Sequence, residues 1–531
     1  MAPDKSEGKT SAEMPVQVQA QSTDYDIDYE KHGAQREANP LPDLKRKLKS
    51  RHLQMIAIGG TIGTGLFIGS GTAIAHGGPV GALIAYIFVG TIVYSVMTAL
   101  GEIATYIPIP GAFTSYAARL IDPSLGFAMG WIYWFSWAST FALELTATGL
   151  IIQFWNSNIP IAIFIAVFWV VIIIFNMMPV AFYGEIEFWF ASIKVITVIG
   201  FMIFSICMNA GVGREGYIGF RYWVHPGPFV PYLIKGNDSL AKFVGFWSTL
   251  IQAGFSYQGT ELVGIAAGET ENPRKTVPSA IRKTFFRIVF FFILTIFFLG
   301  IVVPSTDDGL LASEGGGAAA NNANASPFVI AANRAGVAAL PGIINAVLLT
   351  VVLSAANSNV YSGSRILVGL AQEGFAPHWF KITSKRGVPY YSVLFTAAFG
   401  LLGFLNVSDA GSTVFTCALK ARNISRDILP YKALWQPWFS WYGLFFNCLI
   451  IITQGFTAFI PHFQVKEFFI NYLSLILFVV LYAGHKIVYR PAFVKPIEAD
   501  LDTGRTTADN ETWETIEPTT WYGKAWQWIC G

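Results

Sequence analysis

The chain has 531 residues, of which 53% are hydrophobic and 13% are charged, and its formal net charge is +2. A soluble domain carries about 25% charged residues, so this composition excludes an ordinary soluble protein and favours one that lies in a membrane. The near-zero net charge gives no reason to expect nucleic acid as a partner. The seven histidines and four cysteines show no CxxC or HxxxH spacing, so neither a metal site nor a disulfide framework is indicated.

Eleven apolar stretches are long enough to cross a membrane, which takes about 20 mostly apolar residues. They predict an all-α, polytopic transmembrane domain over residues 54–485, between a cytoplasmic N-terminal tail, 1–53, and a C-terminal tail, 486–531. The predicted spans are 54–75, 79–101, 126–153, 159–178, 188–209, 243–265, 284–304, 337–360, 389–407, 436–460 and 467–485.

Basic residues predict that the N-terminus is cytoplasmic. A basic cluster, Leu44–Arg51, directly precedes the first span, and cytoplasmic loops carry an excess of lysine and arginine. The loops after spans two, six and eight are also basic, whereas the loop 305–325 has no lysine or arginine. The loop 210–242 contains four basic residues and fits this orientation less well.

The first span contains four glycines in seven residues, each costing about 1 kcal/mol relative to alanine within a helix. One interpretation is close helix packing, because small residues let backbones approach in lipid. The other is an unwound segment whose amides hold a substrate carboxylate, assisted by the N-terminus of a half-helix. The substrate-binding candidates in this run are Gly59, Gly60, Thr61, Ile62, Gly63, Thr64 and Gly65.

The sixth span is interrupted in a similar way, within the run Phe255–Glu261. Irregular backbone at membrane depth is tolerated where it lines a cavity. Two interrupted spans five apart are what a pair of five-helix inverted repeats produces, and such a pair points to the binding site of a transporter. The substrate-binding candidates here are Ser256, Tyr257, Gly259 and Glu261.

A polar stripe on the third span ends in a carboxylate. Ser136, Thr140 and Glu144 follow one another at one-turn spacing, and at 100° per residue the set drifts by only about 80°. The carboxylate could meet the ammonium or guanidinium of a cationic substrate. The alternative is a hydrogen-bonded patch between buried helices.

Other ionisable residues lie at membrane depth, where a charge costs at least a few kcal/mol and is a candidate for function. Lys194 could carry a transported proton, or its ammonium could extend to the membrane interface. Glu261 could serve a gate or a proton step, or could bind backbone amides in a purely structural role. Glu102, at the end of span two, is predicted to be structural.

Several motifs resemble the signatures of one transporter family, the fungal branch of the amino acid–polyamine–organocation superfamily. The resemblance extends over residues 40–531 and is strongest to the arginine and lysine permeases around Ser136, Thr140 and Glu144. The matching runs are Gly59–Gly65, Gly78–Pro108, Gln258–Gly264, Glu271–Lys275 and Ser354–Asn359.

The resemblance implies a leucine-transporter-type fold of twelve helices, with helices one and six discontinuous, and proton symport at the plasma membrane. It implies that Gly59–Gly65 and Ser256–Glu261 bind the carboxylate and amino groups of the substrate. Ser136, Thr140 and Glu144 would contact its side chain. Lys194 matches a lysine that stands where sodium lies in sodium-coupled relatives.

The chain departs from this family at the tenth helix. After residue 408, Val414–Leu419 runs directly into Lys420–Asn423, which resembles the loop that follows that helix. Six residues span about 9 Å as a helix, far short of the roughly 30 Å of a bilayer core. With eleven spans the tail after 485 lies outside, although its five basic residues favour the cytoplasm. We therefore predict that about 25 residues are missing here, through an exon-prediction error or a splice variant.

The predicted function is proton-coupled uptake of basic amino acids at the plasma membrane, without chemical conversion and without a cofactor. The alternatives are a general or neutral amino-acid permease, and a non-transporting membrane sensor that results from the missing helix. The expected partners are the amino acid, protons and the lipid bilayer. Lys5, Lys9 and Lys31 are candidate ubiquitin acceptors, which would bring a ubiquitin-ligase adaptor to the cytoplasmic tails.

Overall fold

The computed structural model describes residues 46–109, 111–156, 158–159, 161–312, 326–399, 435, 437–460, 462–495 and 498–500. These residues are mostly helical, and the β pairing among them is one isolated bridge, between Leu48 and Thr270. The helices of the first half are α1 (Ser50–Thr61), α2 (Thr64–Phe67), α3 (Gly69–Tyr106), α4 (Ala112–Leu120), α5 (Pro123–Ile152), α6 (Ile161–Asn176), α7 (Val180–Asn209), α8 (Arg221–Val224) and α9 (Asp238–Ser256). Those of the second half are α10 (Leu262–Ala266), η1 (Ala267–Glu269), α11 (Pro273–Val302), α12 (Asp308–Ala312), α13 (Pro327–Ala335), α14 (Leu340–Gln372), η4 (His378–Lys381), α15 (Tyr390–Phe399), α17 (Trp438–Thr453), η6 (Phe456–Phe459) and α18 (Val465–Tyr489).

Several described helices can cross a membrane. Six of them have the required length and apolar composition, namely Gly69–Tyr106, Val180–Asn209, Pro273–Val302, Leu340–Gln372, Trp438–Phe459 and Asn471–Tyr489. The helix α5 also has 30 residues. Each of the eleven predicted spans overlaps at least one described helix, but several helices extend well beyond the predicted bounds. The helix α7, for example, begins at Val180, whereas the fifth span was predicted from residue 188.

The first two predicted spans meet inside α3. Gly78 has φ +74°, a left-handed conformation that glycine adopts at no steric cost, and Pro79 follows it. The backbone of Gly78 lies against Pro228, where a Cβ would come within 2.7 Å of the Pro228 carbonyl oxygen. The kink therefore divides the outer end of the first span from the second span.

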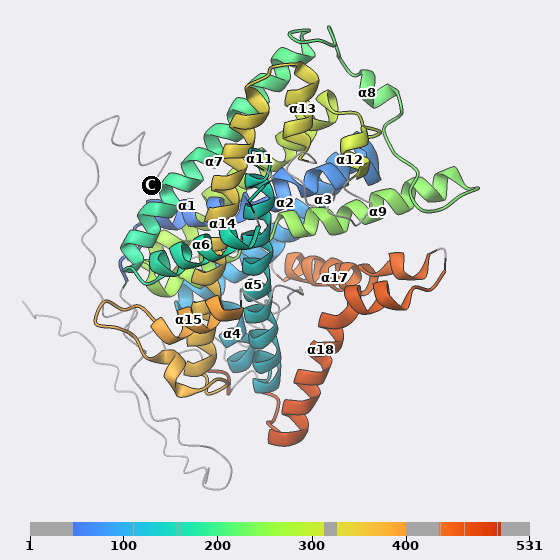
Figure 1. Cartoon of the computed structure of the whole chain (residues 1–531). Helices are drawn as coiled ribbons and strands as arrows, with labels where there is room; N and C mark the ends of the chain where they lie inside the picture. The colour runs from blue at the N-terminus through green and yellow to red at the C-terminus, as the bar shows by residue number, and fades with distance from the viewer. Residues whose placement is uncertain are drawn as a thin grey trace, which may run out of the picture. The chain divides into compact units, whose positions relative to one another are not determined.

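The core forms where a few long helices pack pairwise. The helix α5 packs along α14, α3 packs along α9 and α11, and α1 packs along α7 (Figure 1). The helices α17 and α18 lie next to each other in Figure 1, where α17 packs on α3 and α18 on α5. The unwound ends of α1 and α9 therefore lie inside the helix bundle.

One end of this bundle carries the residues that the sequence places in the cytoplasm. Arg365 on α14 pairs with Glu269 at 3.1 Å, and Glu269 also accepts a hydrogen bond from Tyr361 at 2.5 Å. The rings of Tyr361 and Tyr183 stack with their centroids 4.1 Å apart. At the same end, Arg51 at the start of α1 pairs with Glu185 at the start of α7.

The C-terminal end of α18 lies at this same end. Lys486 pairs with Asp122 at 2.9 Å, and Tyr482 donates to the same carboxylate at 3.0 Å. Asp122 also caps the N-terminus of α5 by accepting from the Ser124 amide at 3.1 Å. The chain that directly follows α18, as far as Lys495, therefore begins at the same end of the bundle as Arg365.

The helices α15 and α17 both run away from the cytoplasmic end. The helix α15 starts beside η4, where Ser392 donates to the Phe380 carbonyl at 2.7 Å, and it leads inward to Thr396, which accepts from Trp134 at 3.1 Å. The helix α17 runs antiparallel to α3, because Phe439 lies against Ser95 and Tyr442 lies against Thr91, farther from the cytoplasmic end. The predicted position of the missing tenth helix, 408–435, falls almost wholly outside the described residues.

Candidate functional site

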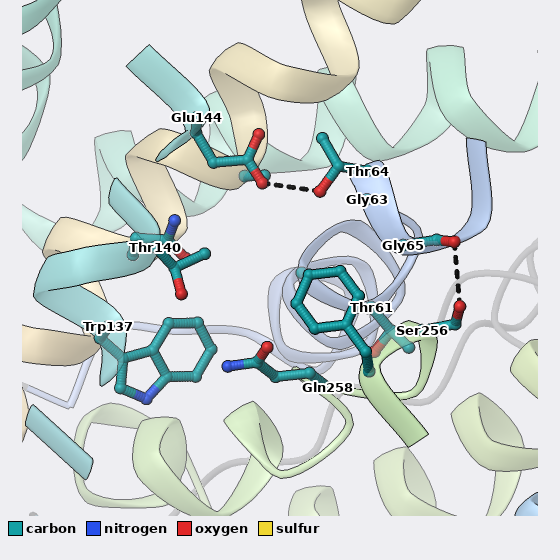
Figure 2. A pocket seen from close by; sticks show the side chains of 13 residues that line it. Thr61, Gly63, Thr64, Gly65, Trp137, Thr140, Glu144, Ser256 and Gln258 are labelled. Atoms are coloured by element: carbon teal, nitrogen blue, oxygen red, sulfur yellow. Dashed lines mark hydrogen bonds between the residues drawn. The ribbon is translucent and has the colours of Figure 1, made fainter. Parts of the chain in front are cut away.

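A small cavity lies where the broken first helix meets α5, α9 and α14. Figure 2 shows its polar lining, with Glu144 and Thr64 on one side and Trp137 and Gln258 facing them across the opening. Its residues are Gly60, Thr61, Gly63, Thr64, Gly65, Trp137, Thr140, Glu144, Phe255, Ser256, Gln258, Ala355 and Asn359.

The first helix breaks in the predicted glycine run. The helix α1 ends at Thr61, Ile62 has φ −77° and ψ 85°, and Gly63 is extended with φ −127°. Four residues of this run besides Thr61 line the cavity, Gly60, Gly63, Thr64 and Gly65, while Gly59 and Ile62 do not. In this segment the Gly63 amide donates to the Thr61 carbonyl at 2.9 Å. Thr64 and Gly65 lie in the first turn of α2, where the N–H groups have no partner within the helix.

The second break packs directly on the first. The helix α9 ends at Ser256 and α10 begins at Leu262, and Gly259 between them has φ +98°. A Cβ on Gly259 would lie 2.6 Å from the Gly60 carbonyl oxygen. The Ser256 hydroxyl donates to the Gly65 carbonyl at 2.9 Å, and a dashed line marks this bond in Figure 2.

The residues of the second break face in different directions. Ser256 lines the cavity, but Tyr257 donates to the Tyr86 carbonyl at 3.1 Å and packs away from it. Glu261 does not line the cavity. Its two carboxylate oxygens accept from the Tyr133 hydroxyl at 2.9 Å and from the Gly259 amide at 3.0 Å. This geometry is the structural tie to a backbone amide that the sequence left open as an alternative.

Glu144 brings a negative charge to the cavity. Its side chain is 4% exposed, one oxygen accepts from the Thr64 hydroxyl at 2.9 Å, and the other has no hydrogen-bond partner among the described residues. Of the described lining residues, Glu144 alone carries a charge. A buried carboxylate with a free oxygen at a cavity wall is suited to bind a cation.

The polar stripe on α5 reaches the cavity with two of its three members. Thr140 lines the cavity together with Glu144, and its hydroxyl donates to the Ser136 carbonyl at 2.8 Å. Ser136 is buried and does not line it. The drift of the stripe around the helix turns the first member away.

Lys194 lies behind the first break, outside the cavity lining. Its ammonium is fully buried and donates to the Gly59 carbonyl, in the last turn of α1. Glu187, two turns earlier on α7, is also fully buried, and its carboxylate lies against the α-carbon of Gly59. Glu144 and Glu187 both interact electrostatically with Lys194.

Sequence reasoning missed several residues at the site. Trp137 and Gln258 stand within the runs that drew attention, but their side chains carry no charge and were passed over. Asn359 belongs to the run Ser354–Asn359, which carries the family resemblance, so that resemblance could have identified it as a site residue. Glu187 lies one residue outside the predicted fifth span, so the error in that boundary hid it.

The sequence is similar to those of known proteins. A family model for amino acid permeases matches residues 52–421 and 410–496. The chain belongs to the amino acid permease family.

A lysine-specific permease of Saccharomyces cerevisiae is 46% identical over 509 residues, covering 91% of this chain and 82% of that permease. A basic amino-acid permease of the same yeast is 44% identical, covering 91% and 88%. A proline-specific permease of Emericella nidulans is 41% identical, covering 91% and 93%.

Membership in this family makes the chain a multi-pass membrane protein of the transporter class, which accords with its long apolar helices. The relatives whose names specify basic substrates and the one named for proline differ little in identity. Overall identity therefore does not by itself distinguish a basic substrate from proline for this chain.

Alanine at Gly65 should destabilise the fold, because its Cβ would lie 2.7 Å from the α-carbon of Ser256. Overpacking of this kind costs about 1–3 kcal/mol. Gly63→Ala is the matched control, since the nearest atom to its Cβ is the Ala355 Cβ at 4.0 Å and its backbone is extended. Thermal unfolding of the purified permeases in detergent should show a lower midpoint for Gly65→Ala alone. Equal midpoints would contradict the close contact of the two breaks.

Replacing Glu144 by Gln should remove a charge partner worth about 2–5 kcal/mol when desolvated, and arginine or lysine transport should fall by about a hundredfold. Thr64→Ala is the control, because it removes the 2.9 Å hydrogen bond and leaves the charge in place, so a smaller loss is expected. Radiolabelled uptake is measured in cells with surface expression quantified. Normal transport by a Gln variant that reaches the surface would refute this role.

Proposed function

We propose that this permease takes up basic amino acids, arginine and lysine, through the plasma membrane together with protons. The observation that carries the proposal is Glu144, the one charge among the described cavity-lining residues, with a free carboxylate oxygen. The names of the lysine-specific and basic amino-acid permeases that resemble this chain support the same substrate class.

The substrate would bind between the two breaks. Its carboxylate would lie against the amides of Gly63–Gly65, and its amino group near the hydroxyl of Ser256 and the backbone of the second break. Thr140 and Glu144 would contact its side chain from α5. Two interrupted helices of this kind support a leucine-transporter-type arrangement with five-helix inverted repeats.

Glu144 lies close to Thr64 and so close to the first break, which raises a second candidate function. If the carboxylate binds the α-ammonium that amino acids share, the protein is a general permease, and the contact of Glu144 with Thr64 at the first break favours this alternative. Competition separates the two. Excess leucine leaves arginine uptake unchanged in a basic permease and suppresses it in a general one.

Proton coupling would act through Lys194. A protonated ammonium donates to the Gly59 carbonyl and secures the inner end of the first break, and its deprotonation would release that end. Glu261 is the second proposed proton-coupling group, and its two hydrogen bonds would make it respond to movement of α5 or of the break.

Arginine uptake should therefore rise as the external pH falls from about 7 to about 5, be independent of sodium, and collapse when a protonophore is added. The measurement is initial-rate uptake in cells that express the chain encoded by the sequenced transcript. Sodium-dependent uptake that persists in uncoupled cells would overturn proton symport.

The missing tenth helix is the remaining part of the proposal. The helices α15 and α17 both run away from the cytoplasmic end, and this shared direction supports a further span between them. The residues between these helices include six consecutive uncharged residues, Val414–Leu419, ahead of Lys420 and Arg422, and no apolar stretch of spanning length follows. The family model matches in two pieces that overlap at 410–421, the position of the proposed gap.

Sequencing the transcript across the codons for 410–425 should reveal about 25 additional residues, the length of one membrane span. The 531-residue chain should transport poorly, and it would then act at most as a membrane sensor that binds amino acids without accumulating them. Arginine-dependent thermal stabilisation without accumulation would favour the sensor. A continuous transcript identical to this chain, encoding a protein that accumulates arginine normally, would show that no helix is missing.

A further inference from the structure

Glu187 is a buried acid that the proposed function does not yet use. It lies on α7, its side chain is fully buried, and one carboxylate oxygen accepts from the Ser354 hydroxyl at 2.6 Å. The other oxygen has no hydrogen-bond partner among the described residues. An ionisable group withdrawn from water in this way is costly, so its presence in a membrane helix calls for a function.

The surroundings of Glu187 connect it to Lys194. The two residues are seven positions apart on α7, which places them on the same helix face, and both lie against Gly59. Lys194 donates to the Gly59 carbonyl, and a Cβ on Gly59 would lie 2.3 Å from a Glu187 oxygen. Glu187 and Glu144 are the two acids that act electrostatically on Lys194.

The two acids lie on opposite sides of Lys194. Glu144 faces the cavity from α5, whereas Glu187 lies toward the cytoplasmic end, where α7 begins. Tyr183 is one turn closer to that end and stacks on Tyr361, beside the Glu269–Arg365 pair. The lysine therefore stands between a carboxylate at the cavity and a carboxylate on the cytoplasmic side.

We propose that Glu187 accepts the proton that Lys194 gives up and passes it to the cytoplasm. No hydrogen bond or ion pair joins the two side chains in the described part of the chain, so an intervening water carries the proton. One N–H bond of the Lys194 ammonium breaks, the water accepts that proton and gives up one of its own, and one O–H bond forms on the free carboxylate oxygen of Glu187. The charged pair becomes a neutral amine and a neutral carboxylic acid, so no charge is created in the apolar interior. The acid then loses its proton to water that enters when the cytoplasmic end opens.

The groups that face Glu187 come from three elements. Lys194 and Tyr183 lie on α7 itself, the side chains of Ser354, Asn357 and Ser358 face it from α14, and the backbone of Gly59 faces it from α1. The amide nitrogen of Asn357 makes no hydrogen bond in the described part of the chain. These neighbours offer hydrogen bonds to either protonation state of the acid, as a site that gains and loses a proton requires.

This inference depends on the proposed proton coupling, and its test separates the two. The transcript-encoded permease is purified and reconstituted in proteoliposomes, and two rates are compared, arginine accumulation driven by a proton gradient and arginine–arginine exchange at equal pH. Exchange does not require Lys194 to lose its proton. In Glu187→Gln, accumulation should fall by about tenfold or more while exchange stays within about twofold of the wild type.

Glu185→Gln is the matched control, because Glu185 lies two residues earlier on α7, is partly exposed, and pairs with Arg51 and His52. Both of its rates should match the wild type. If Glu187→Gln loses accumulation and exchange to the same extent, Glu187 has a structural role and the proton relay is wrong. If the variant keeps both rates at the wild-type level, the relay is also wrong. If that variant does not fold, Ser354→Ala removes the 2.6 Å hydrogen bond and should also reduce accumulation more than exchange. A wild type that ignores the proton gradient refutes the proposed coupling itself.

Discussion

The structure depends on one constraint, that two helices broken inside a membrane have to satisfy each other's free backbone groups. Lipid offers no hydrogen bonds, so an unpaired amide or carbonyl in the hydrocarbon region costs several kcal/mol. Here the Ser256 hydroxyl donates to the Gly65 carbonyl, the Glu261 carboxylate accepts from the Gly259 amide, and Lys194 donates to the Gly59 carbonyl. Each break is therefore stabilised by side chains from a neighbouring break or helix.

This constraint also explains the glycines. At Gly60 a Cβ would meet Leu262, at Gly65 it would meet the backbone of Ser256, and at Gly259 it would meet the carbonyl of Gly60. The two breaks can approach this closely only without side chains at these positions. The cavity is the space that remains beside them, and α5 and α14 close it with polar groups such as Thr140 and Asn359.

How far the sequence could predict this site depends on which physical rule each residue follows. Clustered glycines located the first break, and the single glycine Gly259 among hydrogen-bonding residues located the second. Helical periodicity placed Thr140 and Glu144 on one face. Inside a broken segment no period applies, so the opposite directions of Ser256 and Tyr257 could not be predicted. Glu187 was missed for another reason. Hydropathy places the start of the fifth span at residue 188, whereas α7 packs against α1 and begins at Val180. Gln258 carries neither charge nor apolar surface, and only tertiary structure places it at the cavity.

The charges around Lys194 give a reason why a cationic substrate and a proton would move together. With Lys194 protonated and Glu144 and Glu187 ionised, the three groups sum to −1, and a bound arginine or lysine brings this sum to zero. The loaded protein would then change conformation without moving net charge at this site. After the substrate and the proton leave, the empty site is negative, and an inside-negative potential drives negative charge outward by about 2.3 kcal/mol per charge per 100 mV. The membrane potential would therefore act on the return of the empty permease, and the buried lysine sets how much charge that return carries.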